Sequence, residues 1–403
     1  MELVIDLRRA VLAAAIGLLV AAAILALGAS SADAAKTGPK GAAFYEPPSD
    51  LPKGHGKLIW KRGAGSVVKL EGAAYSTKVL YTSKSPQREQ IAVSGVVSVP
   101  EGEPPKGGWP IISYAHGTTG VADKCAPSGM SAKNPALPFV TYAYPELEDW
   151  IAAGYAVLAT DYPGLGTPGR HPYLIGKSEG RGVLDIVRAG RQLDRDLGDK
   201  FLIAGHSQGG QSALFAARYA EQWVSELELR GTASYAPASH VSEQEQAISG
   251  LTTPGGLTAL AVTIVYGATT ANPLVTAEDI LKPEPLALFP QLDERCLPQL
   301  STPKLYGGIA PADLEQPGQP SAAFAKVLGK MNPAIETSAP ILLSQGLADT
   351  TVFPAFTDLL DGELKALGND VEYNTYPGVT HSEILAAAED TALPWMQGRL
   401  PTG

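Results

Sequence analysis

The most constraining feature of this chain is a serine that stands between two glycines at the end of an apolar segment. Residues 201–204 read Phe-Leu-Ile-Ala, residues 205–209 read Gly-His-Ser-Gln-Gly, and a run rich in small residues continues to about residue 223. A turn this tight needs neighbours with almost no side chain, because its strained backbone lifts the serine hydroxyl clear of the sheet. The pattern predicts a strand, a nucleophile elbow at Ser207 and a helix.

Short apolar runs and helical segments alternate on both sides of this turn. The expected strands are residues 78–82, 91–99, 110–115, 155–160, 201–204, 231–236, 340–344 and 371–376, and the expected helices are 145–153, 177–193, 209–223, 354–367 and 382–389. The first three strands are expected to be antiparallel, after an extended arm that ends near residue 62. The later alternation is typical of parallel strands with helical crossovers. We therefore predict an α/β fold with a mostly parallel eight-stranded sheet flanked by helices.

The alternation stops between the strands expected to end at residue 236 and to begin at residue 340. A loop of that length without structure of its own is uncommon in a compact domain. The segment contains an apolar run at residues 255–271 and then Pro-rich stretches. We predict a mainly helical cap over residues 240–338, which divides the core into residues 36–239, including the arm, and residues 339–403.

The first 35 residues have the pattern of a secretory signal peptide. Arg8 and Arg9 precede an apolar run over residues 10–28, and small residues follow, with Ala32 and Ala34 at a suitable cleavage site. The sequence predicts a secreted protein without stable membrane insertion after cleavage. The apolar run is also long enough for an uncleaved N-terminal membrane anchor, which stays open as the alternative.

The chain has two cysteines, Cys125 and Cys296. In an exported protein such a pair indicates a disulfide bond. Two unpaired, buried thiols are the alternative.

Charge and motif content exclude several kinds of partner. The chain has 31 basic and 41 acidic residues and a net charge of −10, so nucleic acid and anionic membrane surfaces are poor partners. The cysteines and histidines have no zinc-site spacing. Residues 164–166 read Gly-Leu-Gly and lack the third glycine of a dinucleotide loop. We expect neither a metal nor another cofactor, and the oligomeric state is left open.

A serine nucleophile needs a base, and His381 is the best candidate among the six histidines. It lies in the loop after the last expected strand, at the carboxyl edge of the sheet where the elbow also emerges, and catalytic sites of open α/β sheets lie at that edge. His55 in the arm, His206 inside the elbow and His240 at the start of the cap are expected to be structural. A surface-loop histidine is the alternative for His381.

The acid that orients the imidazole is expected to be Asp349. It ends the loop that follows the apolar strand at residues 340–344. Asp358 and Asp361 compete but fall on a helix, and Asp370 precedes a strand at the opposite edge. The order Ser207, Asp349, His381 is that of the α/β-hydrolases.

Two backbone N–H groups are expected to bind the oxyanion of the tetrahedral intermediate. One belongs to Gln208, directly after the nucleophile. The other is expected from Thr118 or Thr119, in the loop at residues 116–120 (His-Gly-Thr-Thr-Gly) that follows the third strand. An ordinary Gly-rich turn is the alternative reading of that loop.

Taken together, these residues resemble the secretory lipase family of the α/β-hydrolases, of the lipase A type with a large cap. The resemblance covers nearly all of the chain after the signal segment. It rests on the loops of Asp349 and His381 and on residues 114–120 (Tyr-Ala-His-Gly-Thr-Thr-Gly), 125–128 (Cys-Ala-Pro-Ser), 160–166 (Thr-Asp-Tyr-Pro-Gly-Leu-Gly) and 205–210 (Gly-His-Ser-Gln-Gly-Gly).

The resemblance implies hydrolysis of carboxylic esters, including acylglycerols at a lipid–water interface, through an acyl-enzyme intermediate. It also implies a disulfide that ties the oxyanion-side loop to the cap, which matches Cys125 with Cys296. Yeast members carry a second disulfide near the C-terminus, for which this chain has no cysteines. The apolar run at residues 257–265 is expected either to shape an acyl-binding tunnel or to be the cap's own buried helix.

Two other functions remain as alternatives. A serine peptidase or an acyltransferase uses the same triad, and a non-catalytic binding protein can have the same fold. The acyl chain length, and with it the choice between lipase and esterase, is left open.

Overall fold

The computed structural model describes residues 35–318 and 320–403. Apart from Ala35, the predicted signal peptide lies outside the described residues. Within these two ranges, no helix is both long enough and apolar enough to cross a membrane.

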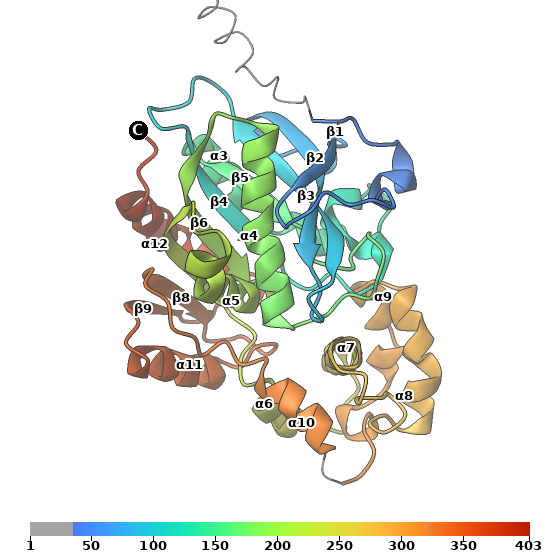
Figure 1. Cartoon of the computed structure of the whole chain (residues 1–403). Coiled ribbons are helices and arrows are strands. Elements are labelled where there is room, and N and C mark those ends of the chain that lie inside the picture. Colours follow the sequence, from blue (N-terminus) through green and yellow to red (C-terminus); the bar gives the residue numbers. More distant parts are fainter. Residues whose placement is uncertain (1–34, 319) are drawn as a thin grey trace, which may run out of the picture. The chain divides into compact units, whose positions relative to one another are not determined.

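One mixed sheet of nine strands forms the centre of the fold, in the order β1-β2-β3-β5-β4-β6-β7-β8-β9 (Figure 1). The strands β1 to β3 pair antiparallel, β3 pairs antiparallel with β5, and all pairs from β5 to β9 are parallel. The strands are β1 (Leu58–Gly63), β2 (Ala73–Lys84), β3 (Gln90–Pro100), β4 (Trp109–Ala115), β5 (Ala156–Thr160), β6 (Leu197–His206), β7 (Glu228–Tyr235), β8 (Ile341–Gly346) and β9 (Val371–Tyr376).

The predicted count of eight strands was wrong by one, and the missing strand is β1. It lies in the segment interpreted as an extended arm, where Lys61 and Arg62 obscure the apolar alternation. At the edge of the sheet, β1 has β2 as its neighbouring strand, and its Lys61 also forms an isolated β-bridge with Thr37. Most residues of β1 are half-buried. Charged residues are common on such strands because they discourage pairing with other chains.

The predicted direction of β4 was also wrong. It is parallel to both neighbours, as the pairings of Ile112 with Val157 in β5 and with Leu202 in β6 show. The chain leaves β4, crosses over through α3 (Tyr144–Ala152) and returns as β5 between β3 and β4. The prediction was wrong because it grouped β4 with β2 and β3, the antiparallel strands that precede it in the sequence.

Helices cover both faces of the sheet, because side chains of each buried strand alternate between two apolar cores. In β4, Ile111 packs in the core that contains Val183 of α4, whereas Ile112 packs in the core that contains Trp150 of α3. The helices α4 (Gly176–Leu193), α5 (Gln208–Trp223) and α11 (Pro354–Ala366) lie on one face, and α3 and α12 (Ile384–Arg399) lie on the other. The last of these continues through Pro394, further than predicted.

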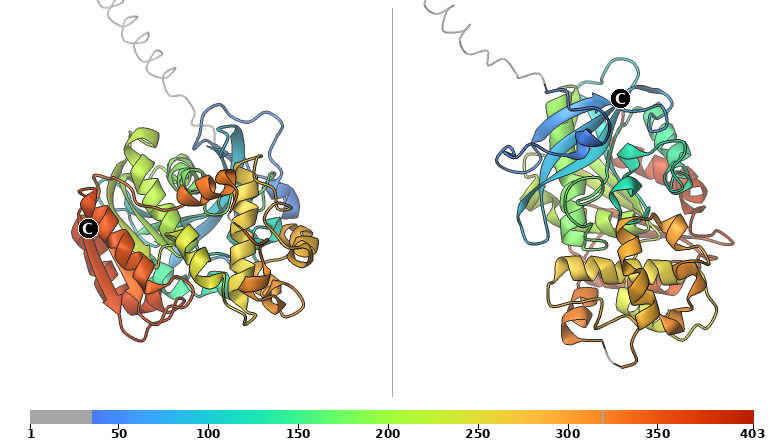
Figure 2. Two further views of the ribbon diagram at one scale, coloured as in Figure 1. Left: turned by 90° about the horizontal axis from the view of Figure 1, so that it is seen from below. Right: turned by 90° about the vertical axis from the view of Figure 1, so that its right-hand side faces the viewer.

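The segment between β7 and β8 is helical in its described residues. It contains α6 (Val241–Ile248), α7 (Gly256–Ala271), α8 (Pro283–Leu288), α9 (Leu297–Leu300) and α10 (Ala322–Gly329). These helices, yellow to orange in Figure 2, lie together at one end of the sheet. They have an apolar core of their own, in which Val262 and Tyr266 of α7 pack with Leu292 and Phe324. The boundaries at residues 240 and 338 stay a prediction.

Candidate active site

The elbow is held by two glycines that no other residue can replace without moving the backbone. A Cβ at Gly205 would lie 2.1 Å from the carbonyl oxygen of Gly209, and a Cβ at Gly209 would lie 1.9 Å from that of Ala115. Ser207, between β6 and α5, has φ 60° and ψ −118°. A positive φ is uncommon for a residue other than glycine, so Ser207 has the strained backbone that the motif predicted.

Three predicted residues from separate loops meet at this turn. Ser207 Oγ lies 2.9 Å from His381 Nε2, and His381 Nδ1 lies 2.6 Å from Asp349 Oδ2. A carboxylate only accepts hydrogen bonds, so Nδ1 carries a proton and Nε2 is free to accept the hydroxyl proton of Ser207. Asp349 is 3% exposed, and its other oxygen accepts the backbone N–H groups of Thr351 and Val352 at 2.8 and 2.9 Å. The imidazole of His381 is thus oriented by a carboxylate whose own position is fixed by hydrogen bonds.

The competing carboxylates lie elsewhere. Asp358 accepts a hydrogen bond from the Tyr373 hydroxyl at 2.7 Å, and Asp361 pairs with Lys365 four residues along α11. Asp370 precedes β9 at the opposite edge, where its carbonyl oxygen accepts the N–H of Ile341.

His206, next to Ser207 in the chain, contacts the backbone of His381. Its Nε2 lies 2.9 Å from the backbone oxygen of His381 and therefore donates, so its Nδ1 accepts the hydrogen bond from the Tyr142 hydroxyl at 2.5 Å. Burial, and secondly the nearby His381, lower the pKa of His206 well below its usual value. A neutral His206 thus anchors the loop of His381.

The two loop threonines occupy different positions. Thr118 lines the same cleft as Ser207, and its hydroxyl lies 2.8 Å from that of Tyr173. Thr119 is fully buried, and its carbonyl oxygen accepts the N–H of Leu297 at 2.9 Å. Of the two, Thr118 is the one that lines the cleft together with Ser207.

The loop that follows is tied to the helical insertion. Cys125 and Cys296 form the expected disulfide, and Gly120 forms a β-bridge with Cys296. The hydrogen bond from Leu297 to Thr119 is part of this bridge, so a disulfide and a β-bridge connect the loop to the start of α9.

Ser207 and His381 line a cleft of about 730 Å³. Ser207, His381 and Thr118 lie on its core side, and Leu257, Leu260 and other residues of the insertion lie opposite. A narrower cavity of about 80 Å³ also reaches Ser207 and continues between α6 and α7. Its lining is mostly apolar, with Val241, Ile248, Leu257, Leu260, Ala261, Ile264 and Val352 among its members.

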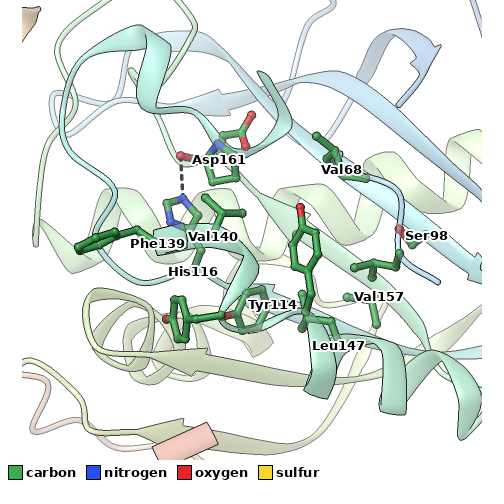
Figure 3. Close-up of a pocket in the computed structure, with 15 residues that line it drawn as sticks. Val68, Ser98, Tyr114, His116, Phe139, Val140, Leu147, Val157 and Asp161 are labelled. Carbon is green, nitrogen blue, oxygen red and sulfur yellow. Dashed lines mark hydrogen bonds between the residues drawn. The ribbon is translucent and has the colours of Figure 1, made fainter. Parts of the chain in front are cut away.

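A further small cavity, of about 40 Å³, lies beside the cleft (Figure 3). Its walls are mainly apolar and include Val68, Val140 and Leu147. Phe139 and Tyr142 line both this cavity and the cleft, so these two side chains form a common wall.

Sequence reasoning missed the polar groups that surround the elbow, namely Tyr142, Tyr173, His171 and Glu179. His171 and Glu179 are fully buried, and both contact the side chain of Gln208. A signal was available, because Glu179 falls on the apolar face of its helix. Among residues 35–318 and 320–403, no group of three or more His, Cys, Asp or Glu side chains has a metal-holding arrangement.

Known proteins resemble this chain in part of its sequence and in its fold. Residues 142–299 match the family model described as secretory lipase. The fold is similar to that of lipase A from Candida antarctica in its closed state, with a TM-score of 0.76, 20% sequence identity, and coverage of 88% of this chain and 84% of that chain. It is also similar to that of the rice cell wall degrading esterase LipA from Xanthomonas oryzae, with a TM-score of 0.68, 19% identity, and coverage of 87% and 99%. No curated protein sequence matches the chain. The predicted α/β-hydrolase fold is confirmed, with nine strands in place of eight.

Proposed function

We propose that this chain, whose residues 142–299 match the secretory lipase family model, is a carboxylester hydrolase that acts through Ser207 as nucleophile, His381 as base and Asp349 as the orienting acid. The observation that carries the proposal is the continuous chain of hydrogen bonds from Ser207 through His381 to Asp349, at the floor of the cleft. Such an arrangement activates a hydroxyl that is otherwise a weak nucleophile.

The reaction has two halves. His381 Nε2 takes the proton of Ser207 as Oγ attacks the ester carbonyl carbon, and the resulting oxyanion accepts hydrogen bonds from the backbone N–H groups of Gln208 and Thr118. When the intermediate collapses, the C–O bond to the alcohol breaks and His381 gives its proton to the departing oxygen. Water then attacks the acyl-enzyme with His381 again as base, which releases the carboxylic acid and restores Ser207.

The substrates are esters with an apolar acyl group. The narrow cavity between α6 and α7 starts at Ser207, and its apolar lining suits a hydrocarbon chain. The two alternatives for the apolar run of α7 are compatible, because Val262 and Val265 pack in the insertion's core while Leu257, Leu260 and Ile264 face the cavities. The wider cleft is left for the alcohol part of the ester.

The site of action is outside the cell, with residues 1–35 removed as a signal peptide. The family description and the disulfide between Cys125 and Cys296 support this location, because disulfides persist in oxidising compartments.

The test is the loss of the nucleophile. Ser207→Ala is expected to abolish turnover of p-nitrophenyl butyrate and labelling by a fluorophosphonate probe, whereas Ser225→Ala, at an exposed position just beyond α5, is expected to retain both. An unchanged rate in Ser207→Ala contradicts the assignment. Amide cleavage, or acyl transfer that outpaces hydrolysis, indicates a peptidase or an acyltransferase, and an unlabelled wild-type protein indicates a binding protein.

A further inference from the structure

The side chain of Gln208 is fixed at both of its amide hydrogens. Its Nε2 lies 2.8 Å from Glu179 Oε1 and 2.9 Å from His171 Nε2. Gln208 is 1% exposed and its two partners are fully buried. The residue whose backbone N–H is expected to bind the oxyanion is therefore anchored beneath the elbow by two groups that the reaction does not consume.

The state of His171 follows from its other contact. Its Nδ1 lies 2.8 Å from the carbonyl oxygen of Pro163, which can only accept, so Nδ1 carries the proton and Nε2 is an acceptor. Burial lowers the pKa of His171 to about 3, which keeps the ring neutral near pH 7. Both neighbours of the Gln208 amide nitrogen are thus acceptors, and each takes one of its hydrogens.

Glu179 also accepts hydrogen bonds from two groups other than Gln208. Its Oε1 also accepts the backbone N–H of Leu174 at 3.0 Å, and its Oε2 accepts the hydroxyl of Ser212, one turn into α5. Leu174 has φ 57°, an uncommon conformation for a branched residue that requires support from its surroundings. The same turn is held from α5 by Gln211, whose amide donates to the carbonyl oxygen of Leu174 at 3.0 Å.

This turn also contacts Thr118, the second proposed oxyanion donor. The neighbouring residue, Tyr173, has its hydroxyl 2.8 Å from that of Thr118. Glu179 is thus linked to Gln208 directly and to Thr118 through the turn at residues 172–175. Gly117 and Gly209 beside these two residues have no side chain that can pack, so the backbone of both donors depends on contacts of this kind.

We propose that Glu179, supported by His171, is a positioning residue that sets the two oxyanion-binding N–H groups, those of Gln208 and Thr118, relative to Ser207. The inference rests on the proposed function. Oxyanion donors act because they are oriented before the reaction, and removal of one donor typically lowers kcat by about 100-fold to 1,000-fold. A donor that is displaced but still present is expected to lower the rate about 10-fold to 100-fold. The loss is expected mostly in kcat, because the donors bind the oxyanion of the transition state more strongly than the carbonyl oxygen of the bound ester.

Two substitutions at residue 179 separate the contacts from the charge. In Glu179→Gln the amide oxygen can still accept from Leu174 and Gln208, and the amide nitrogen can donate to Ser212, so kcat is expected to stay within about 3-fold of wild type. In Glu179→Ala both acceptors are lost, and we expect kcat for p-nitrophenyl butyrate and the rate of fluorophosphonate labelling to fall about 10-fold to 100-fold with KM within about 3-fold.

The matched control is Asp185→Asn on the same helix. Asp185 is also buried, but its carboxylate accepts from His55 at 2.6 Å and Trp223 at 2.8 Å, away from the elbow. This variant is expected to keep the wild-type kcat. Gln208→Met is the second test, since it removes both side-chain donors but keeps the backbone N–H, and a loss of kcat of at least about 10-fold is expected.

The outcomes are distinct. A folded Glu179→Ala protein with wild-type kcat overturns the inference, as does an equal loss of kcat in Asp185→Asn. If Glu179→Ala does not fold, Gln208→Met decides, and wild-type kcat in that variant overturns the inference. An unlabelled wild-type protein would instead refute the proposed function, so the two failures are distinguishable.

Discussion

The buried carboxyl of Glu179 makes the stability of the protein depend on pH, and Glu179→Gln measures that dependence. Burial raises the pKa of Glu179 from its ordinary value of 4.5 to about 7, although hydrogen bonds from Ser212, Gln208 and Leu174 act in the opposite direction. The native state therefore binds this proton more tightly than the unfolded state does. Stability from this group is fully present below pH 4.5 and is lost as the pH rises through about 7.

The size of the effect follows from the two pKa values. Their difference corresponds to about 3 kcal/mol in the free energy of unfolding, of which about 2 to 3 kcal/mol falls between pH 5 and pH 8. Glutamine resembles the protonated acid at all pH values. Relative to wild type, Glu179→Gln is expected to gain that amount of stability between pH 5 and pH 8.

Other groups with shifted pKa values are present in both proteins, so their contributions cancel in this comparison. Burial raises the pKa of Glu389 to about 7 and of Glu245 to about 9. The contribution of each group to the free energy of unfolding therefore falls as the pH rises, as it does for Glu179. His171 has the opposite dependence, because its lowered pKa gives stability that is present above pH 6.5 and is lost as the pH falls toward 3. All three groups are present in both proteins.

The assay is urea unfolding of wild type and Glu179→Gln at pH 5 and at pH 8, with the free energies extrapolated to water. Glu278→Gln, at an exposed position in the helical insertion, is the control and is expected to show no pH-dependent difference from wild type. A difference between wild type and Glu179→Gln that is the same at both pH values refutes the reasoning.

Two further predictions concern the helical insertion. Replacing Cys125 and Cys296 together by alanine removes a link across 171 residues and is expected to lower the free energy of unfolding by up to about 5 kcal/mol on the chain-entropy model, measured by urea unfolding. A change below about 1 kcal/mol would show that the bridge constrains the unfolded chain little. Ile264→Trp places a larger side chain in the narrow cavity between α6 and α7 and is expected to lower kcat/KM for p-nitrophenyl laurate at least about 10-fold more than for the butyrate. An equal loss for both esters would contradict the placement of the acyl chain.

The sequence predicted the elements that depend on local constraints. The elbow at Ser207 needs two glycines, an apolar strand and a helix in direct succession, and all of these are visible within about fourteen residues. The loops of Asp349 and His381 could be placed because each follows an apolar strand, and carboxyl ends of parallel strands share one edge.

The errors in the sheet depend on pairing between distant segments. The direction of β4 depends on β5 and β6, which follow it by about 40 and 90 residues, and no local pattern in residues 109–115 records that choice. The strand β1 was missed because an edge position, with one neighbouring strand in the sheet, places few demands on its side chains.

The polar network beneath the elbow could be predicted only in part from the sequence. Glu179, Val183, Ile186 and Gly190 recur with the spacing of one helical face, so the sequence already places a carboxylate on the buried side of its helix. A buried carboxylate costs free energy unless donors surround it, so this position predicts that polar partners exist. It does not predict which ones, because they come from the turn at residues 172–175 and from α5, segments that meet only in the folded chain. A polar residue on an apolar helix face near a predicted nucleophile is therefore a signal that sequence analysis can use, and the three-dimensional structure is needed to say what it holds.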